Sequence, residues 1–237
     1  MSMIADFHSH ILPGVDDGSR STEESLRMLT EEAKQGVRRI VATPHFYPSQ
    51  ETMERFLQRR ETAARQLQEA VSGRTDLPEI ALGAEVLYFR GISEVPEIRK
   101  LAIQGTDCIL VEMPMARWTD TMYRELEDLR RCQGLTPIVA HVDRYLGRFL
   151  DHGIPGRLEQ LPVLVQANAE FFINKSSRGK ALRMLGREQI HLLGSDCHSM
   201  GTRRPNLQEA TQIIADRLGP DAMEQILSYE NMVFASK

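Results

Sequence analysis

Short apolar runs that end in a histidine or an acidic residue recur from one end of the chain to the other. The runs read IADFHSH, RRIVATPH, EIALGAEV, DCILVEMP, LTPIVAHV and IHLLGSDCH. Five of the seven histidines lie within these endings. Histidines placed at random on a surface would not show this arrangement. The pattern favours a fold in which the ends of many strands converge on one place.

Helical patterns alternate with the apolar runs. Ser21 and Glu24 have the spacing of a capping box, apolar residues then recur at helical spacing, and Gly36 can end this first helix. Further helices are predicted at 51–72, 120–132, 176–185 and 206–217. Strands are predicted in the N-terminal run and at 39–43, 79–86, 107–112, 136–141, 163–168 and 190–195. Seven strand and helix units in this order predict an α/β fold of the TIM-like (β/α) barrel type.

Length and composition predict one domain, 1–237, with a substantial core and no linker. A formal charge of −4 with mixed signs argues against nucleic acid as a partner. The sequence has no signal-like N-terminus and no apolar segment of membrane-spanning length, so a cytoplasmic location without membrane insertion is expected. Three cysteines without CxxC spacing predict neither a disulfide framework nor a zinc finger. Helix surfaces rich in Arg and Glu permit a homo-oligomer without requiring one.

Nine side chains at the run endings are candidate metal ligands. In a barrel of this type the functional groups lie at the carboxyl ends of the strands. Residues two apart on an extended segment project to the same side, which applies to the first and the last pair of the set. The nine candidates are His8, His10, Asp17, His45, Glu85, Glu112, His141, Asp196 and His198.

The charge of this set suits phosphate chemistry. Four carboxylates and five neutral imidazoles are enough to hold three divalent ions if some carboxylates bridge. The resulting excess of about two positive charges matches a phosphate monoester dianion, and such ions make hydroxide from bound water near neutral pH. Nitrogen and oxygen ligands without thiolate favour manganese, iron or zinc, and the ligand types do not choose among them. Manganese is the first expectation. Hydrolysis of a phosphoester is therefore the predicted reaction.

Several motifs resemble one known family over nearly the whole chain. They are DFHSHILPGVDDGSRSTEES at 6–25, ATPHFYP at 42–48, LGAEVLY at 82–88, VEMP at 111–114, AHVDRY at 140–145 and GSDCHS at 194–199. HSH followed by VDDG is the most specific of them. The chain resembles the polymerase and histidinol phosphatase (PHP) superfamily and, within it, the bacterial capsule-associated tyrosine phosphatases of the CpsB/CapC type.

This resemblance implies more than the composition does. Family members have a distorted seven-unit (β/α) barrel, a trinuclear metal site and phosphotyrosine phosphatase activity. They usually act together with a bacterial tyrosine kinase that controls exopolysaccharide synthesis. A tyrosine-phosphorylated protein is therefore the implied partner, and such a kinase is the leading candidate. Carried over position by position, the family's ligands fall on the same nine residues.

Two arginines are predicted to complete the site. Arg144 matches the arginine of the family's histidine, apolar, acid, arginine motif, and a guanidinium there can grip two phosphate oxygens. The second is Arg203, although Arg204 is an open alternative because the sequence reads TRRPN. In the predicted mechanism a metal-bridging hydroxide attacks phosphorus beside Asp196, which is both ligand and catalytic residue, while the arginines stabilise the equatorial oxygens. A phenolate leaves readily, which favours phosphotyrosine over phosphoserine.

Alternative interpretations remain at this point. Cys197 and Arg203 have the C-x5-R spacing of thiolate phosphatases, but if Asp196 and His198 face metals from extended backbone, the cysteine points away into packing. A PHP phosphatase for a small metabolite such as histidinol phosphate would share the ligands. A non-catalytic, metal-stabilised regulatory domain is a third function.

Residues outside the set are given smaller roles. Tyr47, Phe46 and Tyr88 follow metal ligands and can either wall a substrate ring or pack in the core. A structural hydrogen bond is expected for Asn168, with a place beside the ligands as the alternative. His152 and His191 are predicted to be surface groups.

Overall fold

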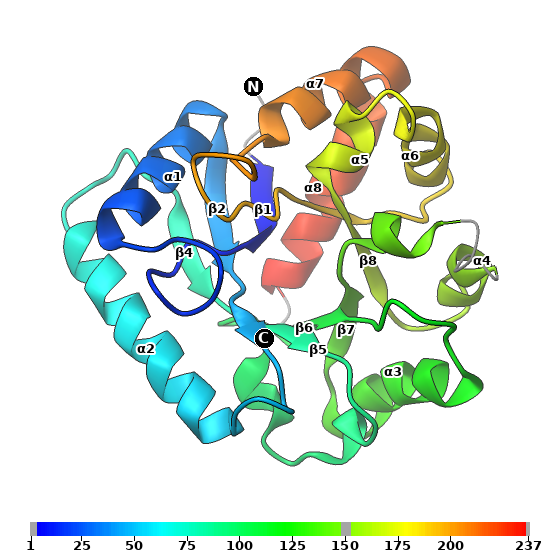
Figure 1. Cartoon of the computed structure of the whole chain (residues 1–237). Coiled ribbons are helices and arrows are strands. Elements are labelled where there is room, and N and C mark those ends of the chain that lie inside the picture. The colour runs from blue at the N-terminus through cyan, green and yellow to red at the C-terminus, as the bar shows by residue number, and fades with distance from the viewer. Residues whose placement is uncertain (1–3, 148–152, 236–237) are drawn as a thin grey trace.

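The computed structural model describes residues 4–147 and 153–235, so that the prediction for His152 lies outside the described residues. It shows a mixed α/β fold in which parallel strands curl together and most helices lie around them (Figure 1). The strands are β1 (Ile4–Ser9), β2 (Val37–Ala42), β3 (His45–Phe46), β4 (Glu79–Leu82), β5 (Glu85–Leu87), β6 (Cys108–Glu112), β7 (Thr136–Val139), β8 (Leu164–Asn168) and β9 (Leu192–Gly194). The α-helices are α1 (Thr22–Lys34), α2 (Met53–Ala70), α3 (Asp120–Gln133), α4 (Ile154–Leu158), α5 (Ala169–Ile173), α6 (Arg178–Leu185), α7 (Leu207–Leu218) and α8 (Pro220–Ala235). Short 3-10 helices lie at Ile92–Glu94, Ile98–Leu101 and Val142–Tyr145.

The strands belong to two parallel sheets. One sheet has the order β1-β2-β4 and the other the order β3-β5-β6-β7-β8-β9. β3 follows β2 after Pro44, which has no N–H to donate and therefore interrupts the ladder. The end of β1 meets the segment after β9 through a bridge between Ser9 and Cys197 and a hydrogen bond of 2.7 Å from Asp196 N to His8 O. The parallel strands therefore curl into at least a half-barrel.

The predicted strands are all present, with one division that the sequence did not indicate. The strand predicted at 79–86 is broken into β4 and β5 around Gly83. At this break Gly83 N donates to Ala42 O and Glu85 N donates to Pro44 O. The chain is therefore interrupted at the same level between β2 and β3 and between β4 and β5. These two interruptions separate the two sheets.

The first helix begins and ends as predicted. The Ser21 hydroxyl accepts a hydrogen bond of 3.2 Å from Glu24 N, as an N-cap should. Gly36 follows the helix with φ of +84°, a conformation that other residues rarely adopt. Helix α1 thus leads the chain from the end of β1 back to the start of β2.

The interior of the curled strands is apolar at its floor. Alternate strand residues form this layer, and α8, which the sequence analysis did not predict, packs beneath it (Figure 1). The Phe234 ring of α8 stacks on Phe7 of β1 with centroids 5.2 Å apart, and Val233 is buried in the same cluster. The buried members from the strands are Ala5, Phe7, Val41, Ala81, Cys108, Leu110, Ile138, Leu164 and Leu192, and Ala140 joins them just after β7.

None of the helices in 4–147 and 153–235 combines the length and apolar character that crossing a membrane requires.

Candidate metal centre

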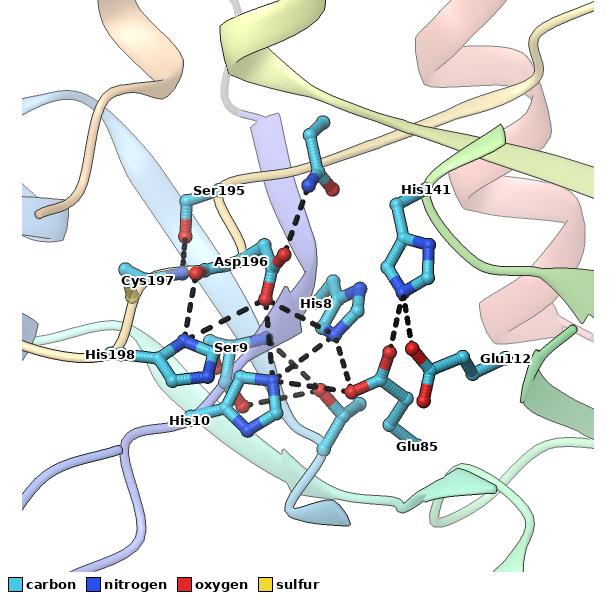
Figure 2. Close-up of polar contacts among 12 residues, drawn as sticks. His8, Ser9, His10, Glu85, Glu112, His141, Ser195, Asp196, Cys197 and His198 are labelled. Atoms are coloured by element: carbon cyan, nitrogen blue, oxygen red, sulfur yellow. Dashed lines mark hydrogen bonds and ion pairs between the residues drawn. The ribbon is translucent and has the colours of Figure 1, made fainter. Parts of the chain in front are cut away.

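All nine predicted ligands come together at the carboxyl ends of the strands. Figure 2 shows seven of them as sticks, with their ring nitrogens and carboxylate oxygens pointing toward one another. Four overlapping groups have ligand atoms within 4.8 Å of each other. These groups are His10, Asp17, His45 and His198; His8, Glu85 and His141; His8, His10 and Asp196; and His45, Glu85 and Glu112.

A bulge in β1 supplies the first histidine of the cluster. Asp6 pairs with Ile40 and Ser9 pairs with Ala42, so that Phe7 and His8 together oppose one residue of β2. Adjacent residues of a regular strand face opposite sides, whereas a bulge re-aims a side chain. Phe7 therefore fills the apolar floor while His8 joins the polar cluster above it.

Four of the five candidate histidines use Nδ1 for contacts with the surrounding protein. This leaves Nε2 of His8, His10 and His141 for the cluster, whereas Nε2 of His198 also contacts Arg203. Hydrogen bonds of this kind select the tautomer and orient the ring of metal-binding histidines. The partners are Gln166 Oε1 for His8 at 3.3 Å, Asp16 Oδ2 for His10 at 2.7 Å, the Tyr145 hydroxyl for His141 at 3.3 Å and the carbonyl of Asp196 for His198 at 2.9 Å.

Asp16 is a site residue that the sequence analysis missed. Besides His10, its carboxylate accepts from Gly18 N at 2.9 Å and His45 N at 3.0 Å. A side chain at Gly18 would place Cβ 2.3 Å from His10 O, so only glycine allows this turn. The one available signal was that VDDG holds two acids, of which Asp16 is the first. Its neighbour Asp17 is 69% exposed at the mouth and lies 3.4 Å from both His45 and His198.

Glu85 lies at the centre of the cluster. Its Oε2 is 3.2 Å from His8 Nε2 and 2.7 Å from His45 Nδ1, yet this buried atom has no hydrogen bond of acceptable geometry within the described structure. Its Oε1 is 2.7 Å from His141 Nε2. Burial opposes ionisation of Glu85, but His8 and the other imidazoles outweigh it and hold its pKa well below the usual range.

The donor set fits divalent cations. A buried carboxylate oxygen without a hydrogen bond, surrounded by imidazole nitrogens, is a costly arrangement unless a cation compensates it. Although burial disfavours charge, Asp16, Asp196 and Glu85 raise the pKa of His10 to about 10, which shows how strongly this cluster attracts positive charge. Nitrogen and oxygen ligands without thiolate suit manganese, iron or zinc.

Both predicted arginines meet Asp196. Arg144 contacts Asp196 Oδ2, and Arg203 Nη2 lies 2.6 Å from Asp196 Oδ1. Arg203 Nη1 is also 2.9 Å from His198 Nε2. Burial would raise the pKa of Asp196, but His8, His10 and Arg144 hold it well below its usual range. Arg204, the alternative, is exposed and makes neither contact.

The backbone at two candidate ligands differs from the predicted extended form. His141 has φ of +30° and Asp196 has φ of +53°, so both lie in the left-handed region. Non-glycine residues are held there only when the surrounding structure compensates the cost. The prediction of extended backbone at Asp196 is therefore wrong, because a left-handed residue turns the chain there.

Cys197 nevertheless points into packing, as predicted. Its side chain is fully buried in an apolar cluster with Ile11, Leu12 and Met28. Burial, with Glu32 nearby, raises the pKa of its thiol well above the usual range. A nucleophilic cysteine needs a lowered pKa and access to the substrate. The C-x5-R spacing is therefore coincidental.

A cavity of about 470 Å³ opens beside the two arginines. Its wall contains the ends of β8 and β9, the segment before α7 and parts of α5 and α7. Charged and polar groups dominate this wall. Its lining residues on the cluster side are Asp143, Arg144, Asn168, Asp196 and Arg203.

The aromatic candidates separate clearly. Phe46 is buried and packs on Phe56, and the Tyr88 hydroxyl donates to Glu125, so both are structural. Tyr47 is half-buried and stacks on the candidate ligand His45, with ring centroids 5.0 Å apart.

Two polar residues link parts of the fold. Asn168 Nδ2 donates to Asp196 Oδ2 at 2.9 Å. Asn168 therefore lies beside the candidate ligands, which is the alternative to a purely structural hydrogen bond. The predicted surface group His191 is half-buried, and its Nδ1 accepts from Val165 N at 2.9 Å. It contributes to the fold and not to the cluster.

The chain is similar in sequence to known proteins over most of its length. The sequence model of the family described as capsular polysaccharide synthesis, CpsB/CapC, matches residues 4–234. A curated relative, tyrosine-protein phosphatase CpsB from Streptococcus pneumoniae, is 30% identical over 93% of each chain. Tyrosine-protein phosphatase YwqE from Bacillus subtilis is 26% identical over 91% of this chain and 85% of its own.

Solved structures support the same fold. One, from work on YwqE of Bacillus subtilis and CpsB of Streptococcus pneumoniae as unique metal-dependent tyrosine phosphatases, has a TM-score of 0.84 at 23% identity and covers 99% of this chain and 95% of its own. The phosphotriesterase homology protein from Escherichia coli, with phosphate in its active site, has a TM-score of 0.56 at 13% identity over 98% of each chain. The match to the family model and the relatives at this coverage lead to one conclusion: the chain belongs to the CpsB/CapC family.

Proposed function

We propose that this chain is a metal-dependent protein tyrosine phosphatase. The proposal rests mainly on one observation: the guanidinium groups of Arg144 and Arg203 both contact the carboxylate of Asp196, at the edge of the histidine-rich cluster. Metal cations and a pair of arginines at one place can together bind and neutralise a phosphate dianion. Two curated relatives are named tyrosine-protein phosphatases, which supports phosphotyrosine on a protein as the substrate.

The chain's own residues bind and orient the phosphate. Arg144 and Arg203 release Asp196 and bind phosphate oxygens, which places phosphorus beside the cluster and neutralises charge that grows on those oxygens. The histidines and carboxylates hold the divalent ions, which when bound supply a nucleophile derived from water at neutral pH. A tyrosine phenolate, with a pKa of about 10, leaves without strong protonation, so the site needs no dedicated general acid for this substrate.

The number and identity of the ions are part of this proposal. We infer three divalent ions, manganese first and iron or zinc as alternatives. Overlapping ligand groups support more than one ion, since His8, His10, His45 and Glu85 each belong to two groups. Metal analysis of protein purified from its natural source tests the number and identity directly.

The distorted seven-unit barrel is also proposed here. If β3 is counted with β2 and β5 with β4, the strands make seven units, and the bridge between Ser9 and Cys197 joins the first to the last. Seven units whose first and last members are joined support a closed barrel.

A bacterial tyrosine kinase of exopolysaccharide synthesis is the partner that we infer, and the cytoplasm is the compartment that we expect. The family description, capsular polysaccharide synthesis, supports this context. Cell fractionation and the phosphotyrosine content of candidate kinases in cells with and without the enzyme test both points.

The decisive experiment compares three substrates. A phosphotyrosine peptide, the matched phosphoserine peptide and histidinol phosphate are incubated with the protein, with manganese and after complete chelation. We expect chelator-sensitive hydrolysis of the phosphotyrosine peptide above all. Full activity after verified metal removal would contradict the metal-dependent mechanism, and preference for histidinol phosphate would contradict the substrate class.

A further inference from the structure

One strand carries a column of side chains from the apolar floor to the metal centre. On β8, Leu164 packs in the floor, whereas Val165 and Ala167 belong to the cluster outside the strands. Residues two apart share a face, so Gln166 and Asn168 continue the column of Leu164 upward. Both amides are buried, with Gln166 fully inaccessible.

The hydrogen bonds of this column have only one consistent direction. His141 N is a backbone donor and lies 2.7 Å from Gln166 Oε1, which fixes the oxygen of this amide on that side. Gln166 Nε2 therefore donates to Asn168 Oδ1 at 3.0 Å. Asn168 Nδ2 then donates to Asp196 Oδ2 at 2.9 Å, an acceptor that cannot donate when ionised. A backbone donor at one end and a carboxylate at the other thus orient both amides.

This direction has a consequence for His8. Its Nδ1 lies 3.3 Å from Gln166 Oε1, an oxygen that can only accept, so Nδ1 carries the proton. The lone pair of the neutral ring is then on Nε2, which faces Glu85 Oε2 at 3.2 Å and Asp196 Oδ1 at 3.5 Å. One amide oxygen therefore selects the tautomer that can bind a cation.

The neighbouring strand is shaped to admit this amide. Gly194 of β9 pairs with Asn168 of β8. A Cβ atom at Gly194 would lie 2.6 Å from His8 Cβ and 2.7 Å from Gln166 Nε2, closer than such atoms can approach. Glycine at this position is required for the contact between β8 and His8.

We propose that Gln166 is a positioning residue of the metal centre, which holds His8 Nε2 toward the ions and, through Asn168, orients one oxygen of Asp196. The inference rests on the proposed metal centre and deepens it. Gln166 touches neither substrate nor reacting atoms, so it acts through the ligands. Partners of this kind affect metal affinity by about 10- to 100-fold.

The test combines metal affinity with the state of one imidazole. Zinc affinity is measured by competition with a chromophoric chelator, and the ring nitrogens of His8 are followed by nitrogen-15 NMR of the zinc-loaded protein. Gln166→Met, which keeps the side-chain length, should lower zinc affinity by about 10- to 100-fold and remove the hydrogen-bonded Nδ1–H signal of His8. Asn168→Ala should weaken zinc binding while that signal remains, because Gln166 Oε1 is still present.

Two further variants keep the test decisive. Gln166→Glu retains an acceptor for His8 Nδ1 and should preserve the signal, even if Gln166→Met fails to fold. Gln133→Met removes a half-buried amide that donates to Ser93 O at 2.8 Å, outside the cluster, and serves as the matched control with unchanged zinc binding.

The outcomes separate this inference from the proposed function. Normal zinc binding and an unchanged His8 signal in Gln166→Met would overturn the positioning role alone, as would loss of the signal in Gln166→Glu. Failure of the wild-type protein to bind zinc would overturn both. A protein that binds zinc and shows the expected losses, yet does not hydrolyse phosphotyrosine, would leave the positioning role standing.

Discussion

At the scale of single residues, Asp196 connects the two halves of the site. One oxygen contacts Arg144 and accepts from Asn168, and the other lies 2.6 Å from Arg203 Nη2 and 3.4 Å from His10 Nε2. The same carboxylate therefore contacts both guanidinium groups and the candidate metal ligands. A phosphate that enters between them competes with Asp196 for the arginines.

We expect the two arginines to act through the planar geometry of the guanidinium group as well as through its charge. Arg144→Lys keeps the charge but loses the planar fork, and we expect kcat/KM for a phosphotyrosine peptide to fall by about 100-fold or more. Arg203→Lys should show a similar loss. Arg204→Ala, the matched control, should stay near wild type. If Arg204→Ala is the damaging change and Arg203→Lys is not, the second clamp has been assigned to the wrong residue.

Tyr47 is the one aromatic candidate that remains for the substrate ring. Its face lies against His45 beside the cluster, and an aromatic contact of this kind contributes about 1 kcal/mol. Tyr47→Ala should therefore raise KM for phenyl phosphate several-fold more than for a small alkyl phosphate, whereas Tyr47→Phe should retain the preference. Equal effects on both esters would show that the ring is only structural.

The thiol of Cys197 should have no part in catalysis. Cys197→Ser should retain activity within a few-fold, because the group is fully buried and its pKa is raised. His141→Ala should abolish turnover under the same conditions, because His141 is a proposed metal ligand at the centre of the cluster. Steady-state kinetics with manganese measures both, and the reverse pattern would support a thiolate mechanism.

At the scale of elements, α8 closes the floor of the sheets and buries an acid there. Glu230 is 5% exposed, and its Oε2 accepts from Ala5 N at 3.0 Å. Burial, with Asp6 nearby, raises the pKa of Glu230 to about 8 from 4.5. A carboxyl with a raised pKa keeps its proton in the folded protein at pH values where the unfolded chain has lost it.

This acid predicts a pH dependence of stability. The stabilising contribution of protonated Glu230 is complete below pH 4.5 and is lost as the pH rises to about 8, on the order of a few kcal/mol in total. Glu230→Gln should remove this decline, so the free energy of unfolding of the variant rises relative to that of wild type between pH 5 and about 8. Urea unfolding at several pH values measures the difference. Glu224→Gln, an exposed change on the same helix, is the control and should track wild type.

At the scale of the whole molecule, the interior is layered. Apolar side chains form the floor, the amides of β8 lie above them, and the histidine and carboxylate cluster lies at the open end. Candidate ligands from both sheets come together in this top layer. Ions bound there would link β1, the β3 and β5 strands, β6 and the segments after β7 and β9, so we expect metal binding and stability to be coupled.

Removal of metal should therefore lower the melting temperature. An ion present at 100 times its Kd stabilises the fold by about 2.7 kcal/mol, which for a domain of this size corresponds to roughly 5–10 °C. A thermal scan of the chelated protein with added manganese measures the shift. His141→Ala should show a smaller shift than wild type. A melting temperature that does not respond to manganese would contradict the coupling.

The sequence predicted the elements better than the contacts between them. Strand positions and the cap at Ser21 follow from local patterns, and so does the gathering of ligands at strand ends. Asp16 and Gln166 were missed because their roles depend on ring nitrogens that reach them only in the folded chain. The left-handed turn at Asp196 was missed for a related reason, since surrounding contacts compensate its backbone cost.

The amino-acid sequence by itself determined the α/β class, the nine ligand candidates and the family, because apolar periodicity and residue spacing are local properties of the chain. Tertiary structure alone decided which ring nitrogen each histidine presents, which arginine meets Asp196, and that α8 covers the floor. These outcomes depend on distances between segments far apart in the chain. Hydrogen-bond geometry and burial act over a few ångströms in space, and no spacing along the sequence encodes them.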